Sequence, residues 1–213
     1  MNVGLIDYGR GNLRSVEKAL QRVGAAVTCL NDPLGIEQQD ALVLPGVGSF
    51  GDAMLNLQER GLVPALQEWL KSDRPFLGIC LGYQLLFESG EESPGISGLG
   101  FLPGTVVRFP KNVGKVPHMG WNSVIPAGEK GRAWFQNLDA APYFYHVHSY
   151  YPEQVAEEDV ACRTEYGFPF VSGISRGNVH AFQFHPEKSQ ENGLKLLSNF
   201  MSLCRTPASS PLS

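Results

Sequence analysis

The segment between Pro75 and Gln84 constrains the fold more than any other part of the chain. It begins as an apolar run, turns at a Gly-x-Cys-x-Gly motif around Cys80, and continues into a pattern that predicts a helix over residues 81–87. So tight a turn strains the backbone of its central residue and requires small residues on both sides. Most lone cysteines are buried small hydrophobes, but these glycines favour a nucleophile elbow, with a helix dipole that favours thiolate over thiol.

The first part of the chain alternates short apolar runs with helical patterns. Besides the run before Cys80, strands are predicted over residues 2–7, 26–30 and 40–44, and helices over residues 12–24, 54–57 and 63–70. This alternation indicates right-handed crossovers and a mostly parallel sheet covered by helices on both faces. Functional residues are then expected at the carboxyl ends of the strands.

The pattern changes after Glu88. Residues 89–100 are rich in Gly, Ser, Glu and Pro, which predicts a loop. Period-2 runs then predict antiparallel strands that extend the sheet, over residues 105–109, 143–150, 160–166, 169–175 and 179–184. A closing helix is predicted around Leu194 to Met201. We therefore expect an α/β fold in one domain, residues 1–205, and a disordered Pro- and Ser-rich tail, residues 206–213.

Composition excludes several classes of function. The net charge is −4, with acidic and basic residues interspersed, so neither nucleic acid nor an anionic membrane is an expected partner and a small substrate is favoured. The first apolar run is too short for a signal or membrane segment. The four cysteines lie far apart, without CxxC or Cys/His metal spacing. We therefore expect no disulfide, metal or cofactor, and a cytoplasmic location.

The segment His185-Pro186-Glu187 can complete a catalytic site around Cys80. A thiol that attacks an amide carbonyl needs a base, and the base needs an orienting acceptor. The segment follows an apolar strand, so it is expected at the same edge of the sheet as the elbow. Pro186 fixes the backbone so that the Glu187 carboxylate reaches one imidazole nitrogen while the other faces sulfur. An isolated His-x-Glu is more typical of a solvated pair, but together with the elbow it predicts catalysis.

A glycine-rich loop, residues 46–48, follows the third predicted strand. Glycines there let the N–H groups around Val47 turn toward negative charge on a tetrahedral intermediate. An ordinary strand-to-helix loop has the same composition, so the segment alone does not establish an oxyanion hole. The N–H of Leu81, directly after the candidate nucleophile, is the natural second donor.

Five further segments occur in a specific order, at residues 7–13, 45–51, 116–122, 148–150 and 185–189. With the Cys80 motif they resemble the class I glutamine amidotransferases and, within that class, the glutaminase subunits of imidazole glycerol phosphate synthase. The resemblance covers residues 3–200 and implies the flavodoxin-like fold of that class, with an added antiparallel section. One departure is His146, where the pattern has an aromatic residue such as Phe; the local packing is therefore left open.

The resemblance implies a glutaminase. Cys80 would be the nucleophile that forms a γ-glutamyl thioester, His185 the general acid and base, and Glu187 the group that orients His185. Ammonia and glutamate would be the products. The residues implied to hold glutamine are Gly48, Gln84, Ser149 and Tyr150.

The resemblance also implies a protein partner in histidine biosynthesis. This is a (β/α)₈-barrel cyclase subunit, which receives ammonia through an internal channel and makes imidazole glycerol phosphate and an aminoimidazole carboxamide ribonucleotide. The residues placed on the docking face and channel entrance are Asn12, Trp121, Tyr145 and Lys188. From the sequence alone, Trp121 is equally typical of a core anchor.

Three alternatives stay open at this point. A sister glutaminase, serving anthranilate, guanylate or pyridoxal phosphate synthesis, would share the triad but not segments 7–13 and 116–122. A non-catalytic binding module on the same fold would not need an intact Cys80, His185 and Glu187. A cysteine stress-response protein with a similar elbow would lack Gln84 and the His-Pro-Glu motif.

Overall fold

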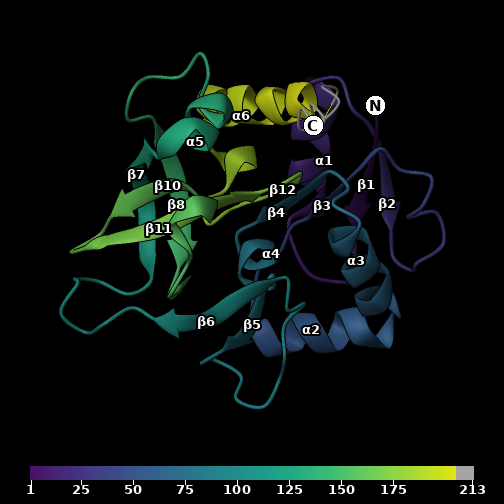
Figure 1. The fold of residues 1–213 in the computed structure, drawn as a ribbon, viewed down its shortest axis with the longest axis horizontal. Coiled ribbons are helices and arrows are strands. Elements are labelled where there is room, and N and C mark those ends of the chain that lie inside the picture. Colours follow the sequence, from purple (N-terminus) through teal and green to yellow (C-terminus); the bar gives the residue numbers. More distant parts are fainter. Residues whose placement is uncertain (205–213) are drawn as a thin grey trace, which may run out of the picture.

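The computed structural model of the chain describes residues 1–204. Within these residues, nine strands form one sheet in the order β2-β1-β3-β4-β12-β11-β10-β7-β8 (Figure 1). Their bounds are β1 Asn2–Ile6, β2 Ala26–Leu30, β3 Ala41–Leu44, β4 Phe76–Ile79, β7 His118–Pro126, β8 Tyr143–His148, β10 Val160–Glu165, β11 Pro169–Arg176 and β12 Val179–Phe182. The predicted disordered tail, residues 206–213, lies outside the described residues, and so does residue 205 of the predicted domain.

Helices cover both faces of the sheet, as predicted. Leu42 and Leu44 of β3 belong to the hydrophobic core under α2 and α3, whereas Ala41 and Val43 face the core under α1 and α6. This period-2 alternation is what a strand buried on both faces produces. The helix bounds are α1 Leu13–Arg22, α2 Phe50–Glu59, α3 Leu62–Lys71, α4 Leu81–Gln84, α5 Gly128–Trp134 and α6 Gln190–Leu203, with 3₁₀ helices η1 Glu157–Asp159 and η2 Pro186–Lys188.

Strand β12, near the C-terminal end of the described chain, determines where the candidate site lies. It pairs in parallel with β4 and antiparallel with β11, so it joins the parallel half of the sheet to the antiparallel half. Phe182 lies opposite Ile79, and the N–H of Cys80 donates to the carbonyl of Phe182 across 2.8 Å. The residues that follow the two strands therefore emerge side by side, although about a hundred positions separate them in the sequence.

A second, three-stranded sheet corrects one prediction. Its strands are β5 Phe87–Gly90, β6 Leu102–Arg108 and β9 Tyr150–Pro152, in the order β5-β6-β9. The predicted strand over residues 105–109 therefore lies in this sheet and does not extend the main one. The predicted loop over residues 89–100 likewise begins inside β5. Period-2 patterning identifies a strand but not its sheet, because pairing is decided by distant residues.

The helix after the elbow is also shorter than predicted. It ends at Gln84, and Phe87 already belongs to β5. Leu85, Leu86 and Phe87 are all fully buried, and an unbroken buried run does not distinguish a helix from a strand. A helix of one turn aligns few peptide dipoles, so the predicted support of a thiolate by the helix dipole loses most of its basis.

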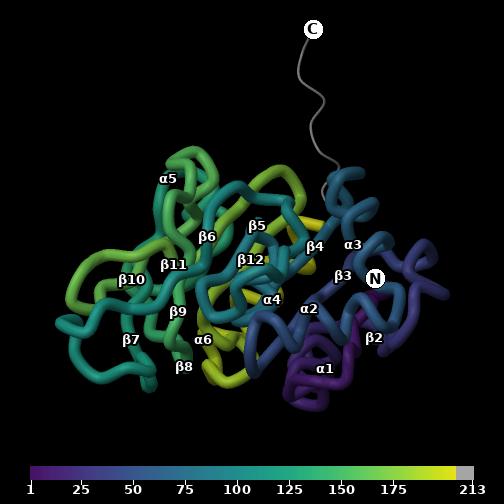
Figure 2. The backbone as a smooth tube through the Cα atoms, turned by 90° about the horizontal axis from the view of Figure 1, so that it is seen from below, coloured from purple at the N-terminus to yellow at the C-terminus, as the bar shows by residue number. Residues whose placement is uncertain are grey.

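Strand β7 and helix α5 were not predicted. Met119, Trp121 and Ile125 alternate on one face of the strand, but this face is exposed and Ser123 interrupts it. Together with β8, β9 and β10 it lies at the end of the molecule opposite β2 (Figure 2). None of the helices within residues 1–204 has the length and apolarity needed to cross a membrane.

Candidate active site

Cys80 occupies a strained elbow. Its backbone has φ 56° and ψ −106°, a left-handed region that residues other than glycine rarely adopt. The flanking glycines are required by close contacts, as the motif predicted. A Cβ atom on Gly82 would lie 1.9 Å from the carbonyl oxygen of Leu44, and one on Gly78 would lie 2.8 Å from the carbonyl oxygen of Gly82. The turn therefore holds the sulfur at the end of β4, where its side chain borders a cavity.

His185 and Glu187 form a buried pair beside the elbow. Nδ1 of His185 donates to Oε1 of Glu187 across 2.8 Å, and each side chain is only 2% exposed. Nε2 of His185 has no hydrogen-bond partner in residues 1–204, so it is free to exchange a proton. Burial opposes the imidazolium form, but the charges of Cys80 and Glu187 outweigh it and raise the pKa of His185.

Backbone and hydroxyl contacts fix the position of His185. Its N–H donates to the carbonyl of Tyr145 in β8 across 2.9 Å. Ser189 joins the same two residues, because its hydroxyl donates to the carbonyl of His185 across 2.6 Å and accepts from the N–H of Tyr145 across 3.0 Å. The candidate base is thereby anchored to β8, the last strand of the main sheet.

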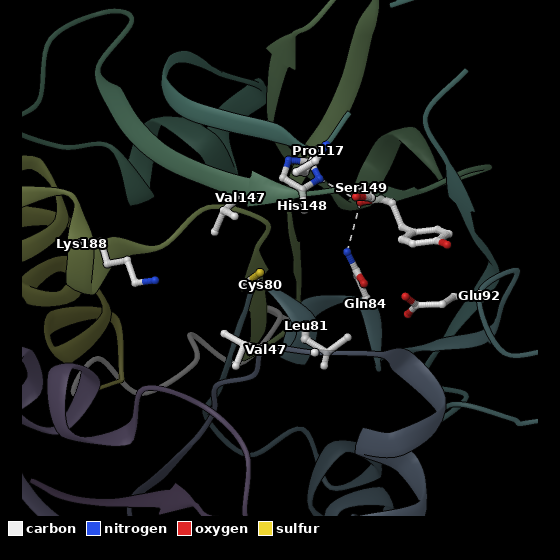
Figure 3. Close-up of a pocket in the computed structure, with 12 residues that line it drawn as sticks. Val47, Cys80, Leu81, Gln84, Glu92, Pro117, Val147, His148, Ser149 and Lys188 are labelled. Carbon is white, nitrogen blue, oxygen red and sulfur yellow. Dashed lines mark hydrogen bonds between the residues drawn. The ribbon is translucent and has the colours of Figure 1, made fainter. Parts of the chain in front are cut away.

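A cavity of about 400 Å³ opens above Cys80 (Figure 3). Its volume lies within the range of small-molecule sites. His185 and Glu187 do not line this cavity; Glu187 lines a separate hollow beside α1. The lining residues are Val47, Gly48, Cys80, Leu81, Gln84, Glu92, Pro117, Val147, His148, Ser149, Tyr150 and Lys188.

The wall brings together every predicted glutamine-binding and oxyanion residue. Val47 and Leu81 both line the cavity, and their loops touch, because a Cβ atom on Gly46 would lie 2.9 Å from the Cβ of Leu81. That atom would also lie 2.3 Å from the hydroxyl of Tyr8, so Gly46 is required by packing. Gly48, in contrast, has φ 100° and open space around its Cα.

Gln84 lies in the cavity wall as predicted, but its amide nitrogen already makes hydrogen bonds within the protein. Nε2 donates to the carbonyl of Tyr150 across 3.1 Å and to Oε1 of Gln183 across 3.0 Å. Both of its N–H groups are therefore used, and only Oε1 remains to contact a ligand. Nε2 of Gln183 in turn donates to the sulfur of Cys80 across 3.8 Å.

Gln183 and Glu92 are among the polar residues of the site that sequence reasoning missed. Gln183 is fully buried and connects Gln84 to Cys80, yet a glutamine two residues before His185 carries no motif of its own. Glu92 lies in the segment that was predicted as a loop, where a carboxylate gives no signal. Its Oε2 accepts from the N–H of Phe50 across 2.8 Å, which holds its carboxylate at the cavity wall.

Three of the four predicted interface residues form one surface cluster. The rings of Trp121 and Tyr145 lie 6.2 Å apart, edge to face, and Nζ of Lys188 lies 5.8 Å from the centre of the Tyr145 ring. Trp121 is 46% exposed, which excludes a role as a core anchor. Asn12 is exposed just before α1, on a different element.

The site and the fold together define a class of protein. Residues 4–203 match the family model of class-I glutamine amidotransferases, so the chain belongs to that family. The fold is shared with a solved glutamine amidotransferase, at a TM-score of 0.75 and 20% identity over 96% of this chain and 99% of that one. It is also shared with PurLQS from Thermotoga maritima, at a TM-score of 0.74 and 19% identity over 95% and 98% of the two chains.

Relatives of higher identity narrow the family further. The chain is 50% identical to imidazole glycerol phosphate synthase subunit HisH of Desulfitobacterium hafniense, over 93% of this chain and 92% of that one. It is also 50% identical to the HisH subunit of Aquifex aeolicus, over 94% and 96% of the two chains. The chain is therefore a member of the HisH family, which confirms the resemblance found in the sequence and does not support a sister glutaminase.

Proposed function

We propose that the chain is the glutaminase subunit of imidazole glycerol phosphate synthase, with Cys80, His185 and Glu187 as its catalytic residues. One observation carries these roles. The strained turn holds a thiol at the wall of a 400 Å³ cavity, and this thiol interacts with His185 of a buried, hydrogen-bonded His–Glu pair. Buried carboxylate–imidazole pairs of this kind serve to orient a base and to stabilise its protonated form.

The chemistry follows from these positions. Cys80 transfers its proton to Nε2 of His185, and the sulfur attacks the side-chain carbonyl carbon of glutamine. His185 returns the proton to the departing nitrogen, so ammonia leaves and a γ-glutamyl thioester remains. Water then gives a proton to His185 and adds to the thioester carbonyl; the thiolate leaves and recovers the proton, and glutamate is released. Glu187 keeps the ring in one orientation throughout.

Backbone donors would stabilise the oxyanion of both tetrahedral intermediates. The N–H of Leu81 follows the nucleophile directly, and Val47 lies on the touching loop across the cavity wall. Removing a single donor of this kind typically costs about 2.7–4 kcal/mol of transition-state stabilisation. These two donors would therefore supply a large share of the rate enhancement.

The remaining wall can hold the amino-acid end of glutamine. Glu92 offers a carboxylate to the α-ammonium group, and Ser149, which lines the same cavity, offers a hydroxyl (Figure 3). Gly48 lines the same wall without a side chain. Gln84 acts chiefly as part of the wall, since its N–H groups hold Tyr150 and Gln183, and its Oε1 is left as an acceptor.

The partner is a cyclase subunit that consumes the ammonia. We place its docking face on the surface cluster of Trp121, Tyr145 and Lys188, with Asn12 as a further contact. Support comes from the exposure of Trp121, and from Lys188, which belongs both to this cluster and to the cavity wall. The catalytic thiol must stay reduced, which fits the cytoplasm.

The decisive experiment separates ammonia release from ammonia use. The chain is combined with a histidine-pathway cyclase subunit, and product formation is measured with glutamine and with an ammonium salt. Cys80→Ser should abolish the glutamine-driven reaction and leave the ammonia-driven one intact. Equal loss of both reactions would point to damage of the fold or interface, and retained glutamine hydrolysis would remove Cys80 from the mechanism.

A further inference from the structure

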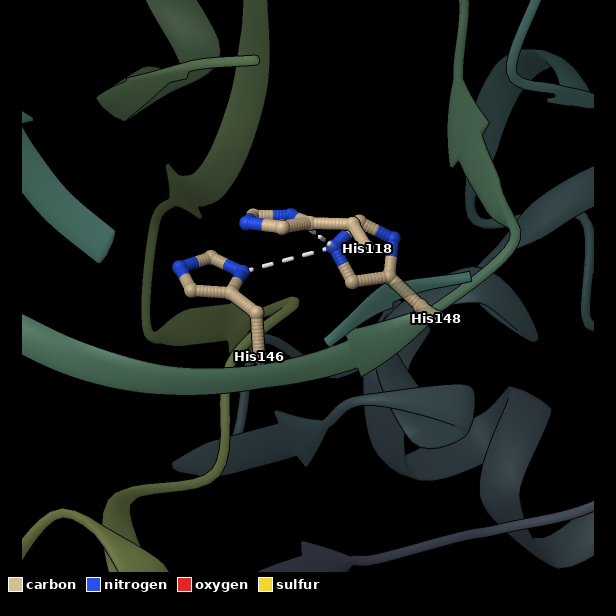
Figure 4. Close-up of side chains that lie close together, drawn as sticks. All are labelled: His118, His146 and His148. Atoms are coloured by element: carbon tan, nitrogen blue, oxygen red, sulfur yellow. Dashed lines mark hydrogen bonds between the residues drawn. The ribbon is translucent and has the colours of Figure 1, made fainter. Parts of the chain in front are cut away.

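Three buried histidines that the proposed catalytic cycle does not use lie together at one wall of the cavity. His118 comes from β7, and His146 and His148 come from the neighbouring β8 (Figure 4). Each offers a ring nitrogen, and these three nitrogens all lie within 4.8 Å of one another. The spacing of these residues in the sequence gave no signal, because antiparallel pairing of β7 with β8 brings them together.

The ring nitrogens cannot all be satisfied by hydrogen bonds. Nδ1 of His148 donates to the carbonyl of Tyr150 across 2.8 Å, so its Nε2 has one lone pair to offer. Nδ1 of His118 approaches that Nε2 at 3.2 Å, and Nδ1 of His146 approaches it at 3.3 Å. Two ring nitrogens therefore compete for the single lone pair on Nε2 of His148. In addition, Nε2 of His146 is buried without a hydrogen-bond partner in residues 1–204.

The chemistry of the donors suits a metal ion. All three imidazoles are buried, and the bond from Nδ1 of His148 to the Tyr150 carbonyl leaves Nε2 of His148 with a lone pair. Neutral imidazole is the form that ligates metals. His148 lines the glutamine cavity and Pro117, next to His118, does so too, which gives an ion a path from solvent.

We propose that His118, His146 and His148 form a binding site for a divalent transition metal, with Zn²⁺ as the fitting ion. Two imidazole nitrogens bound to tetrahedral Zn²⁺ at 2.0–2.1 Å lie about 3.3 Å apart, and the two contacts to Nε2 of His148 have this length. The bond from Nδ1 of His148 to the Tyr150 carbonyl is the outer support that metal-bound histidines usually have. Three histidines leave a fourth position for water.

The three histidines lie close enough together to bind one ion, but their rings are not oriented for it. The rings of His118 and His146 are stacked with an interplanar angle of 24°, so one of them must rotate before both lone pairs point at one ion. Nδ2 of Asn122 lies 3.2 Å from Nε2 of His118 and donates to the carbonyl of Glu165. When Nδ1 of His118 binds a metal, its Nε2 carries the proton and meets this second donor. These costs weaken binding and identify Asn122 as a determinant of affinity.

Zinc binding is tested directly, without reference to catalysis. The Cys80→Ala chain is used as background, because it removes the thiol that would compete for Zn²⁺ beside His185. Equilibrium dialysis against ZnCl₂, followed by elemental analysis, should give one Zn²⁺ per chain. His146→Phe in this background should weaken binding by more than about tenfold. Phe retains the ring among Phe170 and Phe184, so the fold is expected to survive and is checked by circular dichroism.

Asn122→Asp supplies a second test, in which zinc binding is expected to strengthen instead of weaken. A carboxylate would accept from Nε2 of His118 in the metal-bound state, so this variant should bind Zn²⁺ more tightly and show a larger zinc-dependent rise in Tm than the background chain. Absence of stoichiometric Zn²⁺ from the background chain would overturn the proposal. So would equal zinc affinity of the background and His146→Phe chains. Neither result bears on the glutaminase reaction, which is measured separately.

Discussion

The N–H of His185 donates to the carbonyl of Tyr145 across 2.9 Å, which ties the candidate base to the outermost strand of the sheet. The Tyr145 side chain belongs to the exposed cluster with Trp121 and Lys188. The same strand continues into Ser149 and Tyr150 at the cavity wall. A partner that presses on this cluster therefore acts on an element that holds both the base and the substrate wall.

Ser189→Ala tests this connection. The hydroxyl of Ser189 bonds both His185 and Tyr145, so its loss should let the imidazole drift while leaving the glutamine cavity intact. We expect kcat for glutamine hydrolysis by the complex to fall roughly tenfold or more, with little change in KM, since small misplacements of catalytic groups are costly. Ser202→Ala, on the exposed side of α6, is the control and should retain normal kinetics. An unchanged kcat in Ser189→Ala would show that Tyr145 and Glu187 position the base without Ser189.

Glu187→Gln tests the buried pair. The amide would preserve the shape of the side chain but not the charge that stabilises imidazolium, and it permits the wrong ring tautomer. Turnover of glutamine should fall at least about a hundredfold, far more than KM rises. His185→Asn should be worse, because it removes the proton carrier itself. Steady-state kinetics that show normal turnover in Glu187→Gln would reduce Glu187 to a structural carboxylate.

The pH dependence of the free energy of unfolding should reveal the protonation of His180. Burial, and secondarily the charge of Lys130, lowers the pKa of this histidine to about 3. Its Nδ1 accepts from Nε1 of Trp134 across 3.2 Å and lies 2.8 Å from the hydroxyl oxygen of Ser175. Protonation of Nδ1 would break the bond from Trp134. The folded pKa lies below the ordinary value of about 6.5, so its contribution to stability is complete above about pH 6.5 and is lost as pH falls toward 3.

His180→Gln isolates this effect. Urea unfolding at several pH values should show that wild-type chain loses free energy of unfolding faster than the variant between pH 6.5 and 4.5. The difference should approach about 1.4 kcal/mol for each pH unit. The variant itself is expected to be less stable at pH 7, so the slopes are compared rather than the absolute values. Parallel slopes would mean that His180 takes up no extra proton on unfolding.

We expect the partner to control the rate of glutamine hydrolysis through the glycine-rich loop of residues 46–48, which we propose as a source of an oxyanion donor. Tyr8 and Leu81 leave no room for a Cβ at position 46, whereas Gly48 has φ 100° and open surroundings. The Val47–Gly48 peptide, which carries the N–H of Gly48 next to Val47, is therefore the part free to change orientation. One well-aimed donor is worth about a hundred- to a thousandfold in rate. Glutamine hydrolysis should therefore be slow for the chain alone and rise with cyclase and again with cyclase plus its nucleotide-like substrate. Rates that agree within a few-fold in all three conditions would show that the donor is already in place.

Gly48→Ala refines that experiment. No atom lies within 4 Å of a Cβ placed there, so the substitution adds backbone strain without a clash. The strain should redistribute the orientations of the peptide and change the ratio of partner-stimulated to basal rates. A variant with an unchanged ratio would locate the switch elsewhere.

The elbow around Cys80 and the neighbouring pair of His185 and Glu187 were predictable from sequence because each is a local pattern with a local cause. The glycines around Cys80 are required by contacts that no Cβ could tolerate, and His185 and Glu187 are near neighbours in the sequence. The parallel core was predictable for a similar reason, since buried strands and amphipathic helices alternate along the chain itself.

What only the tertiary structure decided is which distant segments meet. The run over residues 105–109 joined the smaller sheet, and the helix after Cys80 stopped after one turn, because packing overrode the local pattern. Gln183 reaches Cys80 only because β12 pairs with β4, and Glu92 reaches the cavity only because the N-terminus of α2 binds it. His118 meets His146 and His148 through the register of β7 with β8. Strand pairing is set by the collective burial of the whole sheet, which no single segment encodes.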